Sequence, residues 1–151
     1  GGLDVEGIVI RNNIFIFAGE LLSGGSKRGR FENNIYWRVD DRDILFDGHR
    51  TLEEWADATG QEKIEDRIVG RIIDPRLVDT GLARLTDPTK LTELAEYRLR
   101  PDSPCIGAGI IIEDNGGRDL WGNEVPKDRK PSIGACQRSI GDHKTQKLKL
   151  C

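Results

Sequence analysis

Two short stretches near the N-terminus each place apolar residues before and after a pair of asparagines, as expected of two short strands joined by a bend. The first runs Gly7-Ile-Val-Ile-Arg-Asn-Asn-Ile-Phe15, and the second runs Arg28-Gly-Arg-Phe-Glu-Asn-Asn-Ile-Tyr36. The two copies align when Asn12 is matched with Asn33 and Asn13 with Asn34. A repeat of about 20 to 30 residues built on a short strand indicates stacked, solenoid-like units. We therefore expect the two segments to lie side by side in the same direction, as neighbouring coils of a parallel β-helix.

The asparagines suit the bend between two strands. Asparagine tolerates the left-handed backbone conformation better than most residues. Its amide can also bond the equivalent amide in the next copy, so Asn12, Asn13, Asn33 and Asn34 are expected to form a structural ladder. A pair of β-hairpins with asparagine-rich turns remains the alternative. Because a repeat needs about three copies to support itself, two copies suggest one end of a longer solenoid, completed by missing N-terminal coils or by a partner chain.

The clearest helix signal lies at residues 51 to 60. Leu52, Trp55 and Ala56 share one helical face, Thr51 can cap the start, and Gly60 can end the helix. A second short helix is predicted to begin at Asp87-Pro88. The remaining chain reads as short strands and turns, so residues 1–137 are expected to form one domain. The basic segment 138–151 is expected to be a loosely ordered tail.

The composition and net charge of the chain restrict the kinds of binding partner that we expect. The chain has 151 residues and a net charge of −3, which argues against nucleic acid as a main partner. No run reaches the roughly 18 apolar residues of a membrane helix, and no signal peptide is visible. Cys105, Cys136 and Cys151 have no spacing typical of a disulfide framework or a zinc site, and the first two are expected to be buried thiols.

Candidate chemistry is sparse. No catalytic residue can be assigned, because two histidines and scattered carboxylates do not assemble into a recognisable catalytic set. The carboxylates of Asp40, Asp41 and Asp43 are candidate ligands for calcium, against the simpler interpretation of a solvated turn. Candidates for stacking against a sugar are the aromatic residues Tyr36, Trp37 and Trp121.

The order of several motifs resembles the C-terminal end of right-handed parallel β-helix proteins of the pectate-lyase-like superfamily. The motifs are the two asparagine segments, the helix beginning Thr51-Leu-Glu-Glu-Trp55, Asp74-Pro-Arg-Leu-Val-Asp79 with Tyr97–Pro104, and a closing set of Ser103–Gly109, Asp119–Gly122 and Ser132–Gln137. The resemblance implies an all-β fold: the terminal coils of a right-handed parallel β-helix, with one or two short helices and a loop-rich C-terminal cap. Gly107, Ser132 and the pair Cys136-Gln137 depart from the family pattern.

Known members of that superfamily act mostly on polysaccharides outside the cell, by lyase or hydrolase chemistry. The resemblance therefore implies an extracellular or periplasmic protein with a polysaccharide partner, in which this segment mainly caps the solenoid of a lyase or glycoside hydrolase. Whether the segment is itself enzymatic stays open, since no family catalytic position maps onto it. The alternative is a non-catalytic carbohydrate-binding or adhesin-like surface module.

Overall fold

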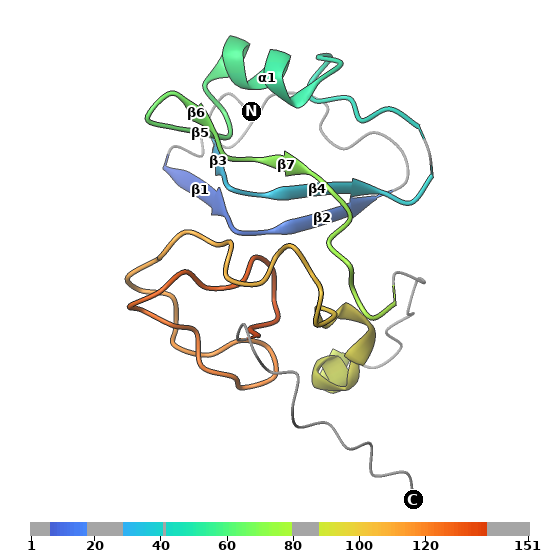
Figure 1. The fold of residues 1–151 in the computed structure, drawn as a ribbon, viewed down its shortest axis with the longest axis vertical. Coiled ribbons are helices and arrows are strands. Elements are labelled where there is room, and N and C mark those ends of the chain that lie inside the picture. Colours follow the sequence, from blue (N-terminus) through green and yellow to red (C-terminus); the bar gives the residue numbers. More distant parts are fainter. Residues whose placement is uncertain (1–6, 18–28, 41, 80–87, 139–151) are drawn as a thin grey trace, which may run out of the picture. The chain divides into compact units, whose positions relative to one another are not determined.

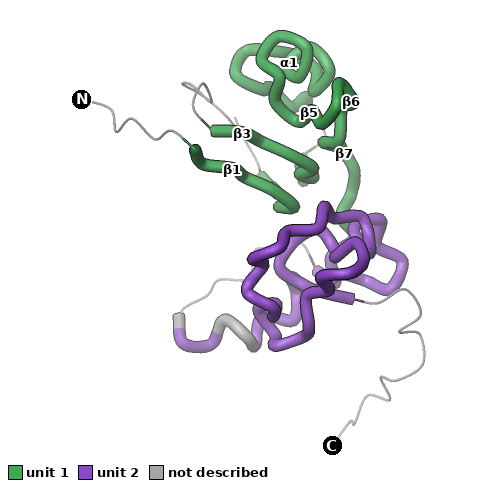
Figure 2. Tube along the Cα trace, turned by 90° about the vertical axis from the view of Figure 1, so that its left-hand side faces the viewer, with its two compact units in different colours: residues 1–75 green, residues 76–151 purple. Residues whose placement is uncertain are grey.

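The computed structural model describes residues 7–17, 29–40, 42–79 and 88–138. The chain divides into two compact units, residues 1–75 and residues 76–151 (Figure 2). The predicted single domain over residues 1–137 stays a prediction, because two compact units can still fold as one cooperative body. The predicted loose tail lies outside the described residues, apart from Arg138.

The first unit is built on two strand–bend–strand segments that stack in parallel (Figure 1). Strands β1 (Ile8–Arg11) and β2 (Ile14–Phe17) form the first segment, and β3 (Gly29–Glu32) and β4 (Ile35–Arg38) form the second. β1 pairs with β3, and β2 with β4, both in parallel and both in the register that the aligned sequence copies predict. The stacking of the asparagine segments, one directly on the other, is therefore confirmed.

The bends between the strands depend on asparagine. Asn12 and Asn33 have φ angles of 56° and 58°, in the left-handed region that few residues other than glycine and asparagine adopt readily. Each bend turns the chain from one sheet into the next, so β1 and β3 belong to a different sheet from β2 and β4. The predicted role of the asparagines at the bends is thus confirmed by the backbone.

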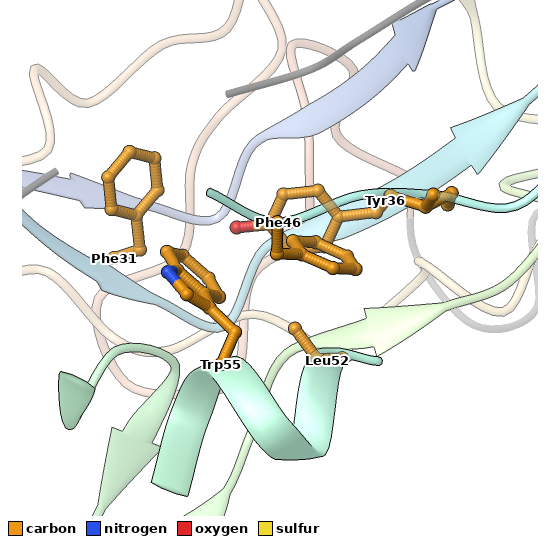
Figure 3. Close-up of a cluster of buried hydrophobic side chains, with 6 residues drawn as sticks. Phe31, Tyr36, Phe46, Leu52 and Trp55 are labelled. Carbon is orange, nitrogen blue, oxygen red and sulfur yellow. The ribbon is translucent and has the colours of Figure 1, made fainter. Parts of the chain in front are cut away.

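An aromatic cluster fills the space between the strands and the single α-helix (Figure 3). The cluster contains Phe31, Tyr36, Ile44, Phe46, Leu52 and Trp55. The Trp55 ring stacks on Phe46, with 5.4 Å between ring centroids, and meets Phe31 edge-on at 5.6 Å. Such aromatic pairs add to the free energy of burying the rings, so this cluster is the main apolar support of the first unit.

Helix α1 (Leu52–Thr59) forms where the sequence predicts it, and its apolar face buries Leu52, Trp55 and Ala56. The hydroxyl of Thr51 accepts a hydrogen bond from the backbone N–H of Glu54 at 3.0 Å, and Gly60 ends the helix in the left-handed conformation. The Glu54 carboxylate reaches back one residue further than in a capping box and accepts from the backbone N–H of Arg50.

The predicted parallel β-helix is wrong as the fold class. The strands form small separate sheets: β1–β3, β2–β4–β7 and an antiparallel pair of β5 (Lys63–Ile64) and β6 (Arg67–Ile68). β7 (Arg71–Ile72) pairs with β4 over only two residues. No continuous or closed sheet forms within the described ranges.

The chain leaves the parallel pattern at a tight hairpin. Glu65 and Asp66, between β5 and β6, both have positive φ angles, 48° and 60°, as in the mirror-image turns that join two antiparallel strands. The β5–β6 hairpin therefore folds back on itself between Glu62, whose backbone N–H bonds the carbonyl of Phe31, and β7, which pairs in parallel with β4. The hairpin thus interrupts the third layer of the stack, which keeps only two residues of parallel pairing in β7.

The second unit consists of turns and short 3₁₀ segments. The predicted second helix appears as 3₁₀ turns at Pro88–Glu93 and Ala95–Tyr97, and the described part of this unit contains no multi-residue strand. Its loops are tied by side chains: the Asp119 carboxylate accepts hydrogen bonds from the backbone N–H groups of Trp121, Asn123 and Gln137. A Cβ added at Gly109 would lie 2.8 Å from the carbonyl oxygen of Pro131, so the two backbone segments approach closely there.

Candidate functional site

The most organised polar structure of the first unit is a ladder of hydrogen bonds that runs through the bends. The backbone N–H and the side-chain amide of Asn13 both donate to Oδ1 of Asn34, at 2.9 and 3.2 Å. In the same way, the backbone N–H and the amide of Asn34 donate to the carboxylate of Glu62, at 3.2 and 2.6 Å. The amide of Asn33 also donates to Oδ1 of Asn12 at 3.0 Å. The predicted asparagine ladder is confirmed, and it continues into a glutamate.

Glu62 ends this ladder because each of its hydrogen bonds to Asn34 and Tyr36 is one that it accepts, and its ionised form has no proton to donate. Glu62 is fully buried, and in addition to the hydrogen bonds from Asn34 it accepts one from the hydroxyl of Tyr36 at 2.7 Å. Burial raises the pKa of Glu62, although the hydrogen bonds from Asn34 and Tyr36 act in the opposite direction. Burial, with the neighbouring carboxylate of Glu62, also raises the pKa of the Tyr36 hydroxyl. An ionised carboxylate has no proton to pass on, so the chain of donors and acceptors stops at this residue.

The far edge of β3 is closed by side chains rather than by another strand. Oε1 of Gln61 accepts from the backbone N–H of Phe31, and its amide donates to the carbonyl of Gly29, both at 2.7 Å. The backbone N–H of Glu62 then donates to the carbonyl of Phe31 at 2.7 Å. The far edge of β4 meets only the two-residue β7. Such coverage by side chains and short strands removes the row of free backbone groups that invites further pairing.

The opposite edge has no such cover. Within the described residues, β1 and β2 are the outermost strands of their sheets. Ile8 and Val9 on β1 are 47% and 42% exposed. A recess of about 400 Å³ lies at the start of β1 and β3 and reaches across to Gln61 at the covered edge, so it does not mark the free edge; it is lined by Gly7, Ile8, Val9, Gly29, Arg30, Thr59, Gly60 and Gln61. The stack therefore has one edge that is covered and one that is free to pair.

At the free edge, the side-chain oxygen of Asn13 is available to accept a hydrogen bond. Asn13 is exposed, and its two donors bond Asn34 and the carbonyl of Arg11. Its Oδ1 has no hydrogen-bond partner in the part of the chain that the structure describes. The equivalent oxygen of Asn34 accepts hydrogen bonds from the backbone N–H and from the side-chain amide of Asn13. Asn13 Oδ1 is thus the position at which another strand–bend–strand segment would continue the ladder.

The three aromatic candidates lie in different environments. Tyr36 is fully buried, with its ring stacked on Phe15 at 5.4 Å, so it offers no ring face to a sugar. Trp37 is half-buried on β4. Trp121, in the second unit, is half-buried, with the guanidinium of Arg98 over its ring at 5.1 Å. The predicted carbohydrate contacts of Trp37 and Trp121 stay predictions.

The candidate calcium ligands lie on an arginine-rich turn. Both oxygens of Asp40 bond Arg38, at 2.6 and 2.8 Å, and the second also bonds Arg42 at 3.0 Å. The hydrogen bonds from Arg38 hold the pKa of Asp40 below its usual value. Asp43 is exposed, and Asp41 lies outside the described residues. The described ranges contain no group of three or more side chains placed to hold a metal ion.

Neither a protein-family model nor a curated protein matches this chain. The resemblance to pectate-lyase-like proteins therefore stays a prediction, as do the expected location outside the cell and the polysaccharide partner. No helix in the described part of the chain is both long and apolar enough to cross a membrane.

Glu62 and Gln61 are functional residues that the sequence patterns did not single out. Glu62 lies further along the chain from Asn34 than Asn34 lies from Asn13, because α1 intervenes, so the repeat alignment does not reach it. A signal was nevertheless present: Gln61-Glu62 directly follows the glycine that ends the helix, and both residues carry side-chain oxygens able to accept from a strand edge.

Proposed function

We propose that the first unit is an end-closing, strand-pairing module. Its free edge, formed by β1 and β2, receives a parallel strand–bend–strand segment, and its covered edge prevents further addition. The observation that carries the proposal is the one-way ladder from Asn13 through Asn34 to Glu62. On the path from Asn13 through Asn34 the donors point toward Glu62, so Oδ1 of Asn13 remains an unused acceptor within the described residues. The rung formed by Asn33 and Asn12 runs in the opposite direction, so only the Asn13–Asn34–Glu62 path supports the proposal.

The chemistry of the incoming segment follows from that direction. It must bring a backbone N–H and a side-chain amide to Oδ1 of Asn13, which an asparagine in a left-handed bend supplies, as Asn13 does for Asn34. Short apolar strands on both sides of that bend would pair with β1 and β2 and cover Ile8 and Val9. This mode is β-strand addition, in which the main chain provides affinity and the side chains provide register.

A second copy of this chain does not fit the free edge. Two copies related by a twofold axis would bring their β1 edges together in antiparallel directions, which does not continue a parallel ladder. Head-to-tail stacking would place β1 against the far edge of β3, where Gln61 and Glu62 already bond Phe31. The covered edge therefore favours a different segment as the partner and limits growth into filaments.

A synthetic peptide tests this proposal on the full chain. The rung peptide has the sequence of residues 7–17 and carries flanking lysines for solubility, so that its asparagines mimic Asn12 and Asn13. Calorimetric titration is expected to show saturable binding with one site per chain. The control peptide has aspartate in place of the asparagine that mimics Asn13, which removes the amide donor and adds a charge.

The aspartate peptide is expected to bind at least about tenfold more weakly, since a lost hydrogen bond together with charge repulsion costs on the order of 1.4 kcal/mol or more. Equal affinity for the two peptides would show that the ladder does not direct pairing. An absence of binding by the asparagine peptide would overturn the proposed function.

Carbohydrate binding is a second candidate function, favoured by the half-exposed indole of Trp37. We propose it as the non-catalytic alternative, because Trp37 is held on a strand between paired neighbours rather than on a loop. A glycan array that includes acidic polysaccharides, probed with wild type and with Trp37→Ala, tests it. Signal lost in the variant supports a stacking role, whereas an equal or absent signal counts against it.

A further inference from the structure

The second unit contains a cavity of about 550 Å³ whose charged lining residues are mostly basic. This volume is within the range of small-molecule sites. The lining residues are Gly107, Asn123, Glu124, Pro126, Arg129, Lys130, Pro131, Ser132, Gln137 and Arg138. Three cationic side chains and one carboxylate therefore face one cavity, although the chain as a whole carries a net charge of −3.

The base of the cavity is held by a compact set of hydrogen bonds. The side chain of Gln137 accepts from the backbone N–H of Ser132 at 2.8 Å and donates to its carbonyl at 3.3 Å. The backbone N–H of Arg138 donates to the Ser132 hydroxyl at 3.3 Å, and Ser132 is buried. The position of Arg138 is thus fixed by its neighbours before any ligand arrives.

The cations of the cavity are weakly neutralised. Arg138 uses Nη1 to donate to the carbonyl of Leu99 at 3.1 Å, and neither it nor Lys130 forms an ion pair within residues 88–138. Arg129 meets Asp128 at 3.9 Å, and both side chains are mostly exposed, so this pair contributes little. Guanidinium groups recognise planar oxyanions through paired N–H donors, and clustered cations in a concavity concentrate their field.

We propose that this cavity binds a small polyvalent oxyanion, a compound carrying several carboxylate or phosphate groups. Arg129, Lys130 and Arg138 supply the positive charge, and Glu124 sets a limit on binding by repelling part of the ligand. The proposal is independent of strand pairing, because every residue of the cavity lies in the second unit.

Calorimetric titration of the full chain with citrate and, separately, with inorganic phosphate tests the site. Chloride keeps the ionic strength constant, and the two arms distinguish a carboxylate site from a phosphate site. Saturable binding of either probe is expected. Combined Arg129→Gln and Lys130→Gln substitutions are expected to weaken it at least about tenfold, since they remove two of the three cations that would bond the ligand. Both residues are exposed, so the variant is expected to fold.

Two further variants make the test specific. Lys127→Gln removes an exposed cation that neighbours the cavity in sequence but does not line it, and it is expected to leave affinity unchanged. Glu124→Gln removes the one carboxylate of the wall and is expected to tighten binding several-fold. Absence of saturable binding by both probes, or an equal loss in Lys127→Gln and in the double variant, would overturn the proposal. So would weaker binding by Glu124→Gln.

Discussion

The two edges of the parallel stack differ in how their polar groups are satisfied. At the covered edge of β3, Gln61 and Glu62 replace the next strand. The Gln61 side chain bonds the N–H of Phe31 and the carbonyl of Gly29, and the backbone N–H of Glu62 bonds the carbonyl of Phe31. The Glu62 carboxylate accepts hydrogen bonds from Asn34 and Tyr36. At the free edge, Ile8 and Val9 are exposed, and Oδ1 of Asn13 accepts no hydrogen bond from any residue that the structure describes. The two edges of one stack thus differ in cover within the described residues, and this difference is the basis of the proposed strand pairing.

The difference shows that covering a strand edge does not require another strand. Two adjacent residues after a helix are enough, because an amide can both donate and accept and a carboxylate can accept several times. This arrangement buries a carboxylate, which is unfavourable in free energy unless every one of its hydrogen-bond donors is present. The covered edge is therefore expected to respond to substitution much more strongly than the free edge.

The largest expected effect compares the two asparagines of the ladder. Asn34→Asp places a second carboxylate against that of Glu62 in the interior and removes the donor to Ile10, so it is expected to lower the free energy of unfolding by about 3 kcal/mol or more. Asn13→Asp, at the exposed end, loses two neutral hydrogen bonds and is expected to cost about 1 kcal/mol. Urea unfolding measures both, and equal losses would contradict the difference between the edges.

A smaller effect is expected from two glycines. A Cβ at Gly70 would lie 2.7 Å from side-chain carbons of Glu62, whereas a Cβ at Gly29 has its nearest neighbour at 3.8 Å. Gly70→Ala must displace the buried carboxylate and is expected to cost about 1 to 3 kcal/mol. Gly29→Ala is the matched control, with a change of about 0.5 kcal/mol or less in either direction. If Gly70→Ala is as stable as its control, the packing around Glu62 is looser than described.

The smallest effect is a dependence of stability on pH. Because burial raises the pKa of Glu62 in the folded chain, the folded state holds the proton over a range in which the unfolded state has released it. The contribution of Glu62 to stability is therefore full below its ordinary pKa of 4.5 and is lost as the pH rises through the folded pKa.

The measurement is the unfolding free energy of the wild type minus that of Glu62→Gln, followed from pH 4.5 upward. This difference is expected to fall with rising pH, and a constant or rising difference would contradict the assignment. The lowered pKa of Asp40 has the opposite effect on stability, which is lost as the pH falls below the ordinary Asp40 pKa of 3.8. This effect is the same in the wild type and in Glu62→Gln, so it cancels in the difference.

Local features of the first unit could be predicted from sequence because each depends on residues close together or on a clear repeat. The alignment of the two asparagine pairs predicts the parallel register, and the pattern from Thr51 to Gly60 predicts α1 with both of its ends. The left-handed asparagines likewise follow from the conformational preference of one residue type. These features are confirmed because tertiary packing agrees with the local preferences.

The continuation of the stack could not be predicted in this way. The Glu65-Asp66 hairpin interrupts the stack, and Glu65 is not among the usual residues for positive φ in a two-residue turn, although Asp66 is. The resemblance of later motifs to a β-helix end therefore led to a wrong fold class. Glu62 was missed for a related reason, since its role depends on where α1 returns the chain and not on any spacing.

The most direct test of the free and covered edges is amide hydrogen exchange on the full chain, with and without the rung peptide. Without the peptide, the amides of β1 and β2 that point away from β3 and β4 are expected to exchange quickly, while those of Phe31, Asn34 and Glu62 exchange slowly. Saturating peptide is expected to protect the first group and leave the second unchanged. Equal protection of both groups in the free chain, or no gain on β1 and β2 with peptide, would contradict the account.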